Sequence, residues 1–397
     1  MKYAIPLGAA LLSLAACSST QSQVTASAKA LHRDMLVLDT HLDTPINFGR
    51  EGWNFAERHT IENDIAQVDL GRMAEGHLDG GFFVIYTEQG DLTPEGYRDA
   101  LAFARERSAL IDREIAAHPR LIGFARTADE VLRLAAAGKL VALKAIENSY
   151  PIGKDLTLLQ EFYDAGVRLA GPVHSVTNQF ADAAGGEAKW NGLSPLGRQW
   201  VAEMNRLGMV IDGSHSSDAT FDEMLRLSKT PLLLSHSSPE AAFDHPRNLD
   251  NARIRQLAAS GGAMCMSTVF LSDMNLSEER GVLFERYENI AGMSPAEQAE
   301  LVRQWRALNK TEPMWSTTFE QYMTALLNLI EVAGVDHVCF GADWDGGGGI
   351  QGLEDITALP VVTQRLLEAG YSPADIEKMA SGNVLRIMRA AEAVRGR

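Results

Sequence analysis

Cysteine, positive charge and long hydrophobic runs are all scarce in this 397-residue sequence. Three cysteines are too few for the disulfide framework of a small secreted domain. Only 36 Lys and Arg stand against 52 Asp and Glu, which gives a formal net charge of −16 at pH 7. Because nucleic-acid binding requires a basic face that neutralises phosphates, we expect no nucleic-acid partner. A hydrophobic content of 46% with 22% charged residues excludes disorder for the bulk of the chain.

Two of the cysteines, Cys265 and Cys339, lie inside short apolar runs. Unpaired cysteine is among the most frequently buried residue types, and it packs there as a small apolar side chain. We therefore expect Cys265 and Cys339 to be buried free thiols.

The third cysteine, Cys17, follows a short apolar segment that begins soon after Lys2. A positive start, a short apolar stretch and small residues before a cleavage point are typical of a secretory signal peptide. The Leu-Ala-Ala-Cys sequence at 14–17 resembles a bacterial lipobox, in which Cys17 is lipidated; the alternative is an ordinary cleaved signal with an incidental cysteine. Ser18 resembles the residue that directs such lipoproteins to the outer membrane.

These features predict three parts of the chain. Residues 1–16 form a lipoprotein signal peptide, residues 17–29 a lipidated flexible tether, and residues 30–397 a single folded domain. The location expected is the bacterial cell envelope, with the lipid in the outer membrane and the domain facing the periplasm. Beyond the signal, no apolar run reaches the roughly 18 residues that a transmembrane helix needs, so we expect a soluble domain.

Short apolar runs alternate with longer amphipathic segments from residue 35 onward, the pattern of parallel strands covered by helices. Eight such runs predict an α/β fold, the closed TIM (β/α)8 barrel. A connection of roughly 65 residues precedes the eighth strand, which predicts a helical insertion over residues 270–318 that either covers the site as a lid or decorates the periphery. The predicted strands are 35–42, 81–87, 141–147, 168–174, 209–215, 231–236, 262–268 and 337–343.

Polar side chains follow the downstream ends of these strands, where (β/α)8 barrels carry their active sites. Buried groups of this kind need partners, so their repetition predicts one shared site. His41 and Asp43 lie two apart and therefore on one side of an extended strand. Imidazoles together with carboxylates suit a zinc-like ion, and the two oxygens of Glu147 allow it to bridge two ions. The candidates are His41, Asp43, Glu147, His174, His215, His236 and Asp343.

Several sequence stretches together resemble the membrane dipeptidase (renal dipeptidase) family of the amidohydrolase superfamily. The most distinctive is Ser-His-Ser-Ser at 235–238, followed by Asp-His-Pro-Arg-Asn at 244–248. The others are 39–45, 67–70 with 80–83, 145–147, 173–175 with Asn178 and 181–182, 208–212 with 214–215, and 341–346. The resemblance extends roughly from residue 30 to residue 390, so it implies a metallo-dipeptidase domain over 30–397.

The resemblance implies a site with two zinc ions. His41 and Asp43 would hold one ion, His215 and His236 the other, and Glu147 would bridge them. Such a pair of cations lowers the pKa of a shared water and so provides a nucleophile at neutral pH. Asp39 is expected to orient His41, and Asp212 to support the strand end.

The resemblance also assigns roles in catalysis and substrate binding. Asp343 would move the proton from water to the leaving amine and hold the substrate ammonium, with Asp345 as the alternative carboxylate. His174 would contact the substrate carbonyl and stabilise the oxyanion, and Arg247 would pair with the terminal carboxylate. Many family members have Gly-Gly-His after the bridging Glu, whereas Glu147 is followed by Asn-Ser-Tyr, so we expect Tyr150 to contact the substrate.

The function expected is hydrolysis of dipeptides, including those with a D-residue at the C-terminal position. Two alternatives stay open: hydrolysis of another carboxylate-bearing amide or lactam, and a binding lipoprotein without catalysis. The expected partners are a dipeptide and a membrane reached through the lipid on Cys17. A homodimer is left open.

Overall fold

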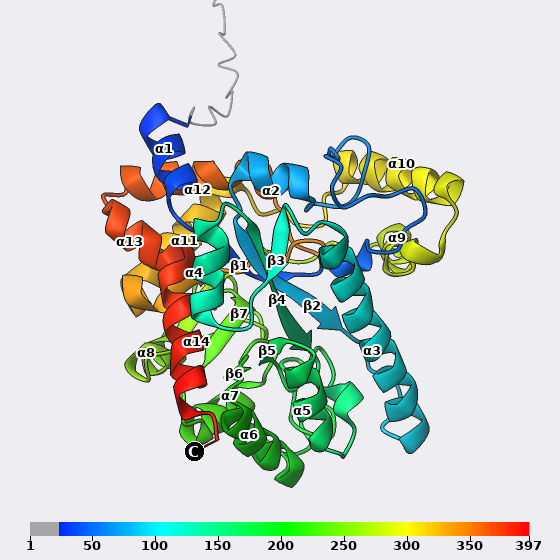
Figure 1. Ribbon diagram of the computed structural model, residues 1–397, viewed down its shortest axis with the longest axis vertical. Helices are drawn as coiled ribbons and strands as arrows, with labels where there is room; N and C mark the ends of the chain where they lie inside the picture. The colour runs from blue at the N-terminus through cyan, green and yellow to red at the C-terminus, as the bar shows by residue number, and fades with distance from the viewer. Residues whose placement is uncertain (1–23, 397) are drawn as a thin grey trace, which may run out of the picture.

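The computed structural model describes residues 24–396, which form an α/β barrel with its strands at the centre and helices around them (Figure 1). The eight predicted strands are all present, which confirms the predicted fold class. A ninth strand, β3 (Ile122–Phe124), was missed; it pairs with β4 at its upstream end. The eight are β1 (Leu38–Leu42), β2 (Gly80–Tyr86), β4 (Leu140–Glu147), β5 (Val167–Ala170), β6 (Val210–Ile211), β7 (Leu233–Ser237), β8 (Ala263–Met266) and β9 (Val338–Phe340).

The strands are parallel and run in two hydrogen-bonded groups, β1-β2-β4-β5-β6 and β7-β8-β9. Two isolated parallel bridges join the groups, one between Asp212 and Leu233 and the other between Leu42 and Trp344. The first bridge joins the end of β6 to the start of β7, and the second joins β1 to the loop after β9, which closes the barrel. The downstream ends of β1, β4, β7 and β9 therefore meet at one face.

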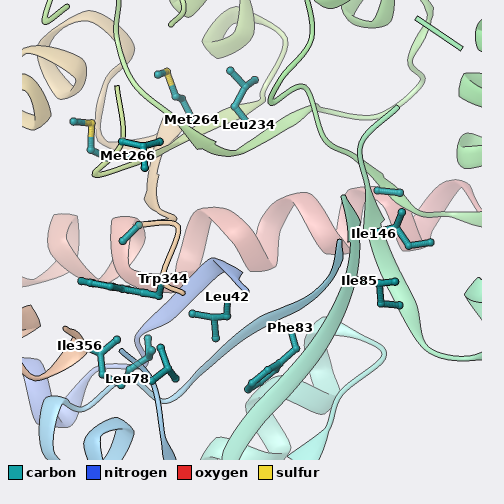
Figure 2. Close-up of a cluster of buried hydrophobic side chains, with 14 of the residues drawn as sticks. Leu42, Leu78, Phe83, Ile85, Ile146, Leu234, Met264, Met266, Trp344 and Ile356 are labelled. Atoms are coloured by element: carbon teal, nitrogen blue, oxygen red, sulfur yellow. The ribbon is translucent and has the colours of Figure 1, made fainter. Parts of the chain in front are cut away.

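Alternate side chains of each strand enter two different cores, as the two-residue period of a strand requires. Phe83 and Ile85 of β2 belong to a cluster that also contains Trp344 (Figure 2). Phe82 and Val84 belong to a second cluster, which includes Val141, Leu143 and Ala145 of β4. Glu147 continues this second face of β4, so the second cluster fills the barrel interior beneath the polar site.

Helices surround the barrel. Several begin at a side chain that accepts a hydrogen bond from the first turn, among them Thr93, Ser194 and Ser217. They are α1 (Ala26–Asp34), α2 (Leu70–Gly76), α3 (Pro94–Ala117), α4 (Ala128–Ala136), α5 (Thr157–Asp164), α6 (Pro195–Leu207), α7 (Asp218–Leu227), α8 (Asn251–Ala259), α9 (Glu278–Glu288), α10 (Pro295–Thr311), α11 (Phe319–Ala333), α12 (Leu359–Glu368), α13 (Pro373–Glu377) and α14 (Asn383–Val394). Among residues 24–396, no helix is long and apolar enough to cross a membrane.

The N-terminal boundary of the domain differs from the predicted one. Helix α1 begins at Ala26, capped by Thr25, and Ala28 is fully buried. The Thr25 amide donates to Gln364 Oε1 on α12 over 3.1 Å. The prediction of a flexible tether is therefore wrong for residues 26–29, because composition did not reveal this cap and its tertiary contact. The predicted signal peptide and Cys17 lie outside the described residues.

The long connection before β9 contains α9 and α10, which lie beside each other at one end of the molecule (Figure 1). Buried polar contacts tie it to the loop after β1. Arg50 donates from Nη1 to Asp64 Oδ1 over 2.8 Å and from Nε to Gln298 Oε1 on α10 over 3.1 Å. Helix α10 of the insertion is therefore packed against the loop after β1.

The prediction of free thiols at Cys265 and Cys339 is wrong, because the two residues form a disulfide. Cys265 lies on β8 directly opposite Cys339 on the neighbouring strand β9. The two positions are 74 residues apart in sequence, and the strand register brings them together. Both side chains are fully buried in the interior cluster.

The disulfide closes a long loop, so its removal should destabilise the fold. We expect the double variant Cys265→Ala/Cys339→Ala to lose about 2–4 kcal/mol in free energy of unfolding, measured by urea denaturation. Both proteins should carry Cys17→Ser so that the remaining thiol does not interfere. Thiol titration of the unreduced, denatured parent should detect no free thiol; two titratable thiols per chain would show that the bond does not form.

Candidate metal centre and active site

The two oxygens of Glu147 face two adjoining groups of side chains at the downstream face of the barrel, and the ring centroids of His41 and His236, one from each group, lie 3.7 Å apart. Oε2 lies 3.4 Å from His41 Nε2, which is itself 3.2 Å from Asp43 Oδ2. Oε1 lies 2.9 Å from His215 Nε2 and 3.3 Å from His236 Nε2. One carboxylate thus joins two clusters of candidate ligands. Each cluster contains the residues that the sequence analysis assigned to one ion.

The donor set fits divalent metal ions. His41 Nε2 is buried and has no hydrogen-bond partner among residues 24–396, although three carboxylates surround it. Two ligands of one tetrahedral zinc ion lie about 3.4 Å apart, given metal–nitrogen bonds of about 2.1 Å. The distances from His41 to Asp43 and Glu147 are close to this value. An unpaired buried nitrogen facing carboxylates is the arrangement that a cation completes.

Electrostatics favour the protonation states that metal binding needs at His215, His236 and Glu147, and the opposite state at His41. Burial lowers the pKa values of His215 and His236 well below the usual value of a histidine, so both rings are neutral. Burial alone would raise the pKa of Glu147, but the charge of the neighbouring His41 and hydrogen bonds from His215 and His236 hold it well below its usual range. For His41, burial is outweighed by the charges of Glu147 and Asp43, which raise its pKa well above the usual value. A metal ion at His41 would therefore displace a proton.

Hydrogen bonds to neighbouring strands orient the ligands. His236 Nδ1 lies 2.8 Å from Ser235 Oγ, and Ser235 Oγ donates to Asp212, which confirms a supporting place for Asp212. Asp39 accepts from the backbone amides of His41, at 2.8 Å, and Ala342, at 3.1 Å. Asp39 therefore fixes the backbone of His41 and ties β1 to the loop after β9.

Asp343 lies on that loop and reaches the first cluster. Its Oδ1 is 3.9 Å from His41 Nε2, and it shares a potential metal-binding group with His41 and Asp43. Asp345, the alternative, is fully engaged elsewhere: Oδ2 accepts from Thr44 Oγ1 over 2.8 Å and Oδ1 from the Gln67 amide over 2.7 Å. The geometry therefore places Asp343, and not Asp345, beside the candidate ligands.

His174 lies on the opposite side of the second cluster, in the loop after β5. Its Nε2 is 3.9 Å from Glu147 Oε1, and its ring centroid is 4.3 Å from that of His215. Its side chain is 30% exposed, whereas those of His41 and His236 are 2% exposed. Burial lowers its pKa, so the ring is a neutral hydrogen-bond donor at the edge of the cavity.

Arg247 and Tyr150, the two other residues predicted to contact the substrate, form hydrogen bonds with groups of the protein itself. Arg247 is buried, donating from Nη2 to the His236 carbonyl over 2.8 Å and from Nη1 to Ser237 Oγ over 3.0 Å. Its Nε has no partner among residues 24–396. The Tyr150 hydroxyl donates to the Asp91 carbonyl over 2.7 Å. Its ring still lines the cavity, where it fixes the shape of the wall.

The cavity over the site has a volume of about 830 Å³. Asp43, Glu147, His174, His215 and Asp343 line its floor. Sequence reasoning missed most of its wall, which comes from α3, α9 and the loops near them, because nothing local marks a helical side chain as facing a cavity. These wall residues include Ile46, Tyr86, Phe103, Arg107, Phe270, Phe284, Tyr287, Glu288 and Trp315.

Because Glu147 faces both ligand clusters and His215 only one, their variants should lose metal affinity in different ways. In titrations of metal-free protein with Zn²⁺, we expect two binding events for the parent and the loss of one for His215→Ala. Glu147→Gln should weaken both by about tenfold or more, because it removes the charge that both clusters share. His337→Ala is the control, since His337 Nδ1 contacts the Gly262 carbonyl away from the site. An unchanged isotherm for Glu147→Gln would contradict a shared ligand.

Comparison with known proteins gives a consistent assignment. The family model described as membrane dipeptidase (peptidase family M19) matches residues 25–397. Dipeptidase tcpJ of Claviceps purpurea is 29% identical over 349 residues, 85% of this chain and 72% of that protein. Dipeptidase 3 of Mus musculus is 28% identical over 378 residues, which cover 93% of this chain and 67% of that protein. The crystal structure of the probable dipeptidase PvdM from Pseudomonas aeruginosa has a TM-score of 0.79 at 26% identity and covers 93% of this chain and 98% of that one. The resemblance seen in the sequence is therefore confirmed: the chain belongs to the membrane dipeptidase family, peptidase family M19.

Proposed function

We propose that this protein hydrolyses dipeptides with two zinc ions held by His41, Asp43, Glu147, His215 and His236. The observation that carries the proposal is the placement of Glu147, whose two oxygens face two ligand clusters on the floor of a large cavity. Zinc ions bound there would supply a water of lowered pKa and polarise the peptide carbonyl. The protein's own residues then have to bind the substrate, orient it and move protons.

Asp343 is the residue placed to move the proton. Burial, together with the charges of Asp43 and Glu147, raises its pKa well above the usual value, although His41 acts in the opposite direction. A carboxyl group in such surroundings is able to take a proton at Oδ1 or Oδ2 and return it to the leaving amine. Its carboxylate form would also attract the substrate ammonium. Both actions need Asp343 to line the cavity, as it does.

His174 and Arg247 would act on the other side of the scissile bond. The neutral His174 imidazole is able to donate a hydrogen bond to the carbonyl oxygen as negative charge develops on it. The charge of the buried Arg247 guanidinium would attract the terminal carboxylate, although Arg247 does not itself line the cavity. An ammonium contact and a carboxylate contact on either side of one bond would favour substrates of two residues.

Other parts of the proposal concern location and assembly. We propose lipidation at Cys17 and attachment to the bacterial outer membrane with the domain facing the periplasm. Whether the protein forms a homodimer is left open. The supporting observation for the anchor is the lipobox-like sequence at 14–17. Its residues lie outside the part of the chain that the structure describes.

A substrate screen tests the reaction and the length of the substrate. We expect the zinc-loaded protein to cleave L,L- and L,D-dipeptides, to lose this activity when chelated, and to leave tripeptides and C-amidated dipeptides largely intact. The physical reason is that a longer or amidated substrate cannot satisfy both end contacts. Equal cleavage rates for C-amidated dipeptides and for dipeptides with a free C-terminal carboxylate would count against Arg247 as the partner of that carboxylate. If the protein cleaved only other carboxylate-bearing amides or lactams, hydrolysis of those compounds would be favoured as its function. If it cleaved none of these substrates, a binding protein without catalysis would be favoured.

Asp343→Asn tests the proton-transfer role. This change keeps the shape of the side chain and removes its ability to accept a proton, so kcat should fall by about 10²–10⁴-fold. Metal content, measured by elemental analysis, should stay at the parent value because the five proposed ligands are untouched. Turnover near that of the parent would rule out Asp343 as the general base.

A further inference from the structure

We propose that Gln67 is a positioning residue for Asp343, acting through the loop over residues 343–349 that carries it. Gln67 lies just before α2, far from this loop in sequence and outside the residues that line the main cavity. The proposal rests on the proposed function, because it gives Gln67 a part in holding the group that moves the proton.

Three hydrogen bonds join Gln67 to the loop. The Asp345 amide donates to Gln67 Oε1 over 2.7 Å, and the Gln67 amide donates to Asp345 Oδ1 over 2.7 Å. Gln67 Nε2 donates to the Gly348 carbonyl over 2.9 Å. The side chain of Gln67 therefore clamps the loop at two points, one two residues after Asp343 and the other three residues further on.

The backbone of this loop needs such support. Asp343 and Asp345 adopt left-handed conformations, with φ of 65° and 67°, which non-glycine residues rarely adopt. Conformations of this kind persist where surrounding contacts over-determine them. At the next position, a Cβ on Gly346 would collide with the carboxylates of Asp43 and Asp343, so the loop backbone lies directly against both groups. A shift of the loop would therefore move Asp343 relative to the metal ligands.

Other residues hold the loop from the remaining sides. The Asp345 carboxylate also accepts from Thr44 Oγ1, next to Asp43. Tyr287 donates to the Asp345 carbonyl over 3.3 Å, and Trp315 Nε1 donates to the Gly347 carbonyl over 2.7 Å. Tyr287 and Trp315 line the cavity, so their replacement would also change the substrate pocket. Gln67 does not line this cavity, so its replacement leaves the substrate pocket unaltered. Its replacement also removes a hydrogen bond of 2.9 Å from Nε2 to the Glu354 carbonyl, which lies beyond the loop.

The test compares the zinc-loaded parent with Gln67→Met, which keeps the side-chain length and removes both of its side-chain hydrogen bonds to the loop. We expect kcat for a dipeptide to fall roughly 10–100-fold, as small displacements of a catalytic group do. KM should stay within about twofold of the parent value and zinc content should be unchanged, because no proposed ligand and no residue of the main cavity is altered. Gln67→Glu keeps the acceptor for the Asp345 amide and loses the donor to Gly348, so it should show a smaller fall and serves if Gln67→Met does not fold.

Gln364→Met is the matched control for a purely structural role. Gln364 is a buried glutamine that accepts from Thr25 at the start of α1, away from the site. It should lower the melting temperature and leave kcat at the parent value. If Gln67→Met only lowered the melting temperature in the same way, with normal kcat, the clamp would be disproved.

Crystal structures of the zinc-loaded parent and Gln67→Met give a readout that does not depend on the substrate. We expect the Asp343 carboxylate to move relative to Asp43 in the variant. An unmoved Asp343 together with normal kcat would overturn the inference. A parent protein that cleaves no dipeptide would refute the proposed function, and the position of Asp343 in the two structures would still decide whether Gln67 holds the loop.

Discussion

The site depends on one buried carboxylate that four imidazoles surround. Glu147 lies within 4 Å of a nitrogen of His41, His174, His215 and His236, and these residues come from four different segments of the barrel rim. A buried charge is costly unless oppositely charged or hydrogen-bonding groups compensate it. The strands must therefore end in register at this level, and every other placement at the site follows from that requirement.

Much of the fold and of the candidate site was accessible from sequence because each signal was local. The strand runs are apolar, and the residues that follow them are histidines and carboxylates, which have few reasons to lie at the ends of buried strands. Strand β3 escaped because it has only three residues. The start of α1 escaped because its cap and its bond to Gln364 depend on tertiary contacts.

The remaining features depend on which side chains meet, and periodicity does not report that. Tyr150 follows a predicted ligand, yet its hydroxyl is taken by a carbonyl from the loop after β2. Asp345 and Asp343 are two residues apart on the same loop, and only their hydrogen-bond partners distinguish them. The disulfide was in principle accessible, since Cys265 and Cys339 lie on consecutive predicted strands. Their exact pairing still requires the register between β8 and β9.

That pairing links the interior core to the site above it. Strand β8 leads into the insertion with α9 and α10, and β9 leads directly to Asp343. The disulfide joins these two strands, so it fixes the spacing of both ends of the connection that contains the insertion. The insertion in turn returns to the loop after β9 through Tyr287 and Trp315. The cavity wall and the Asp343 loop consequently share one anchor in the barrel interior, and neither can move far without disturbing the other.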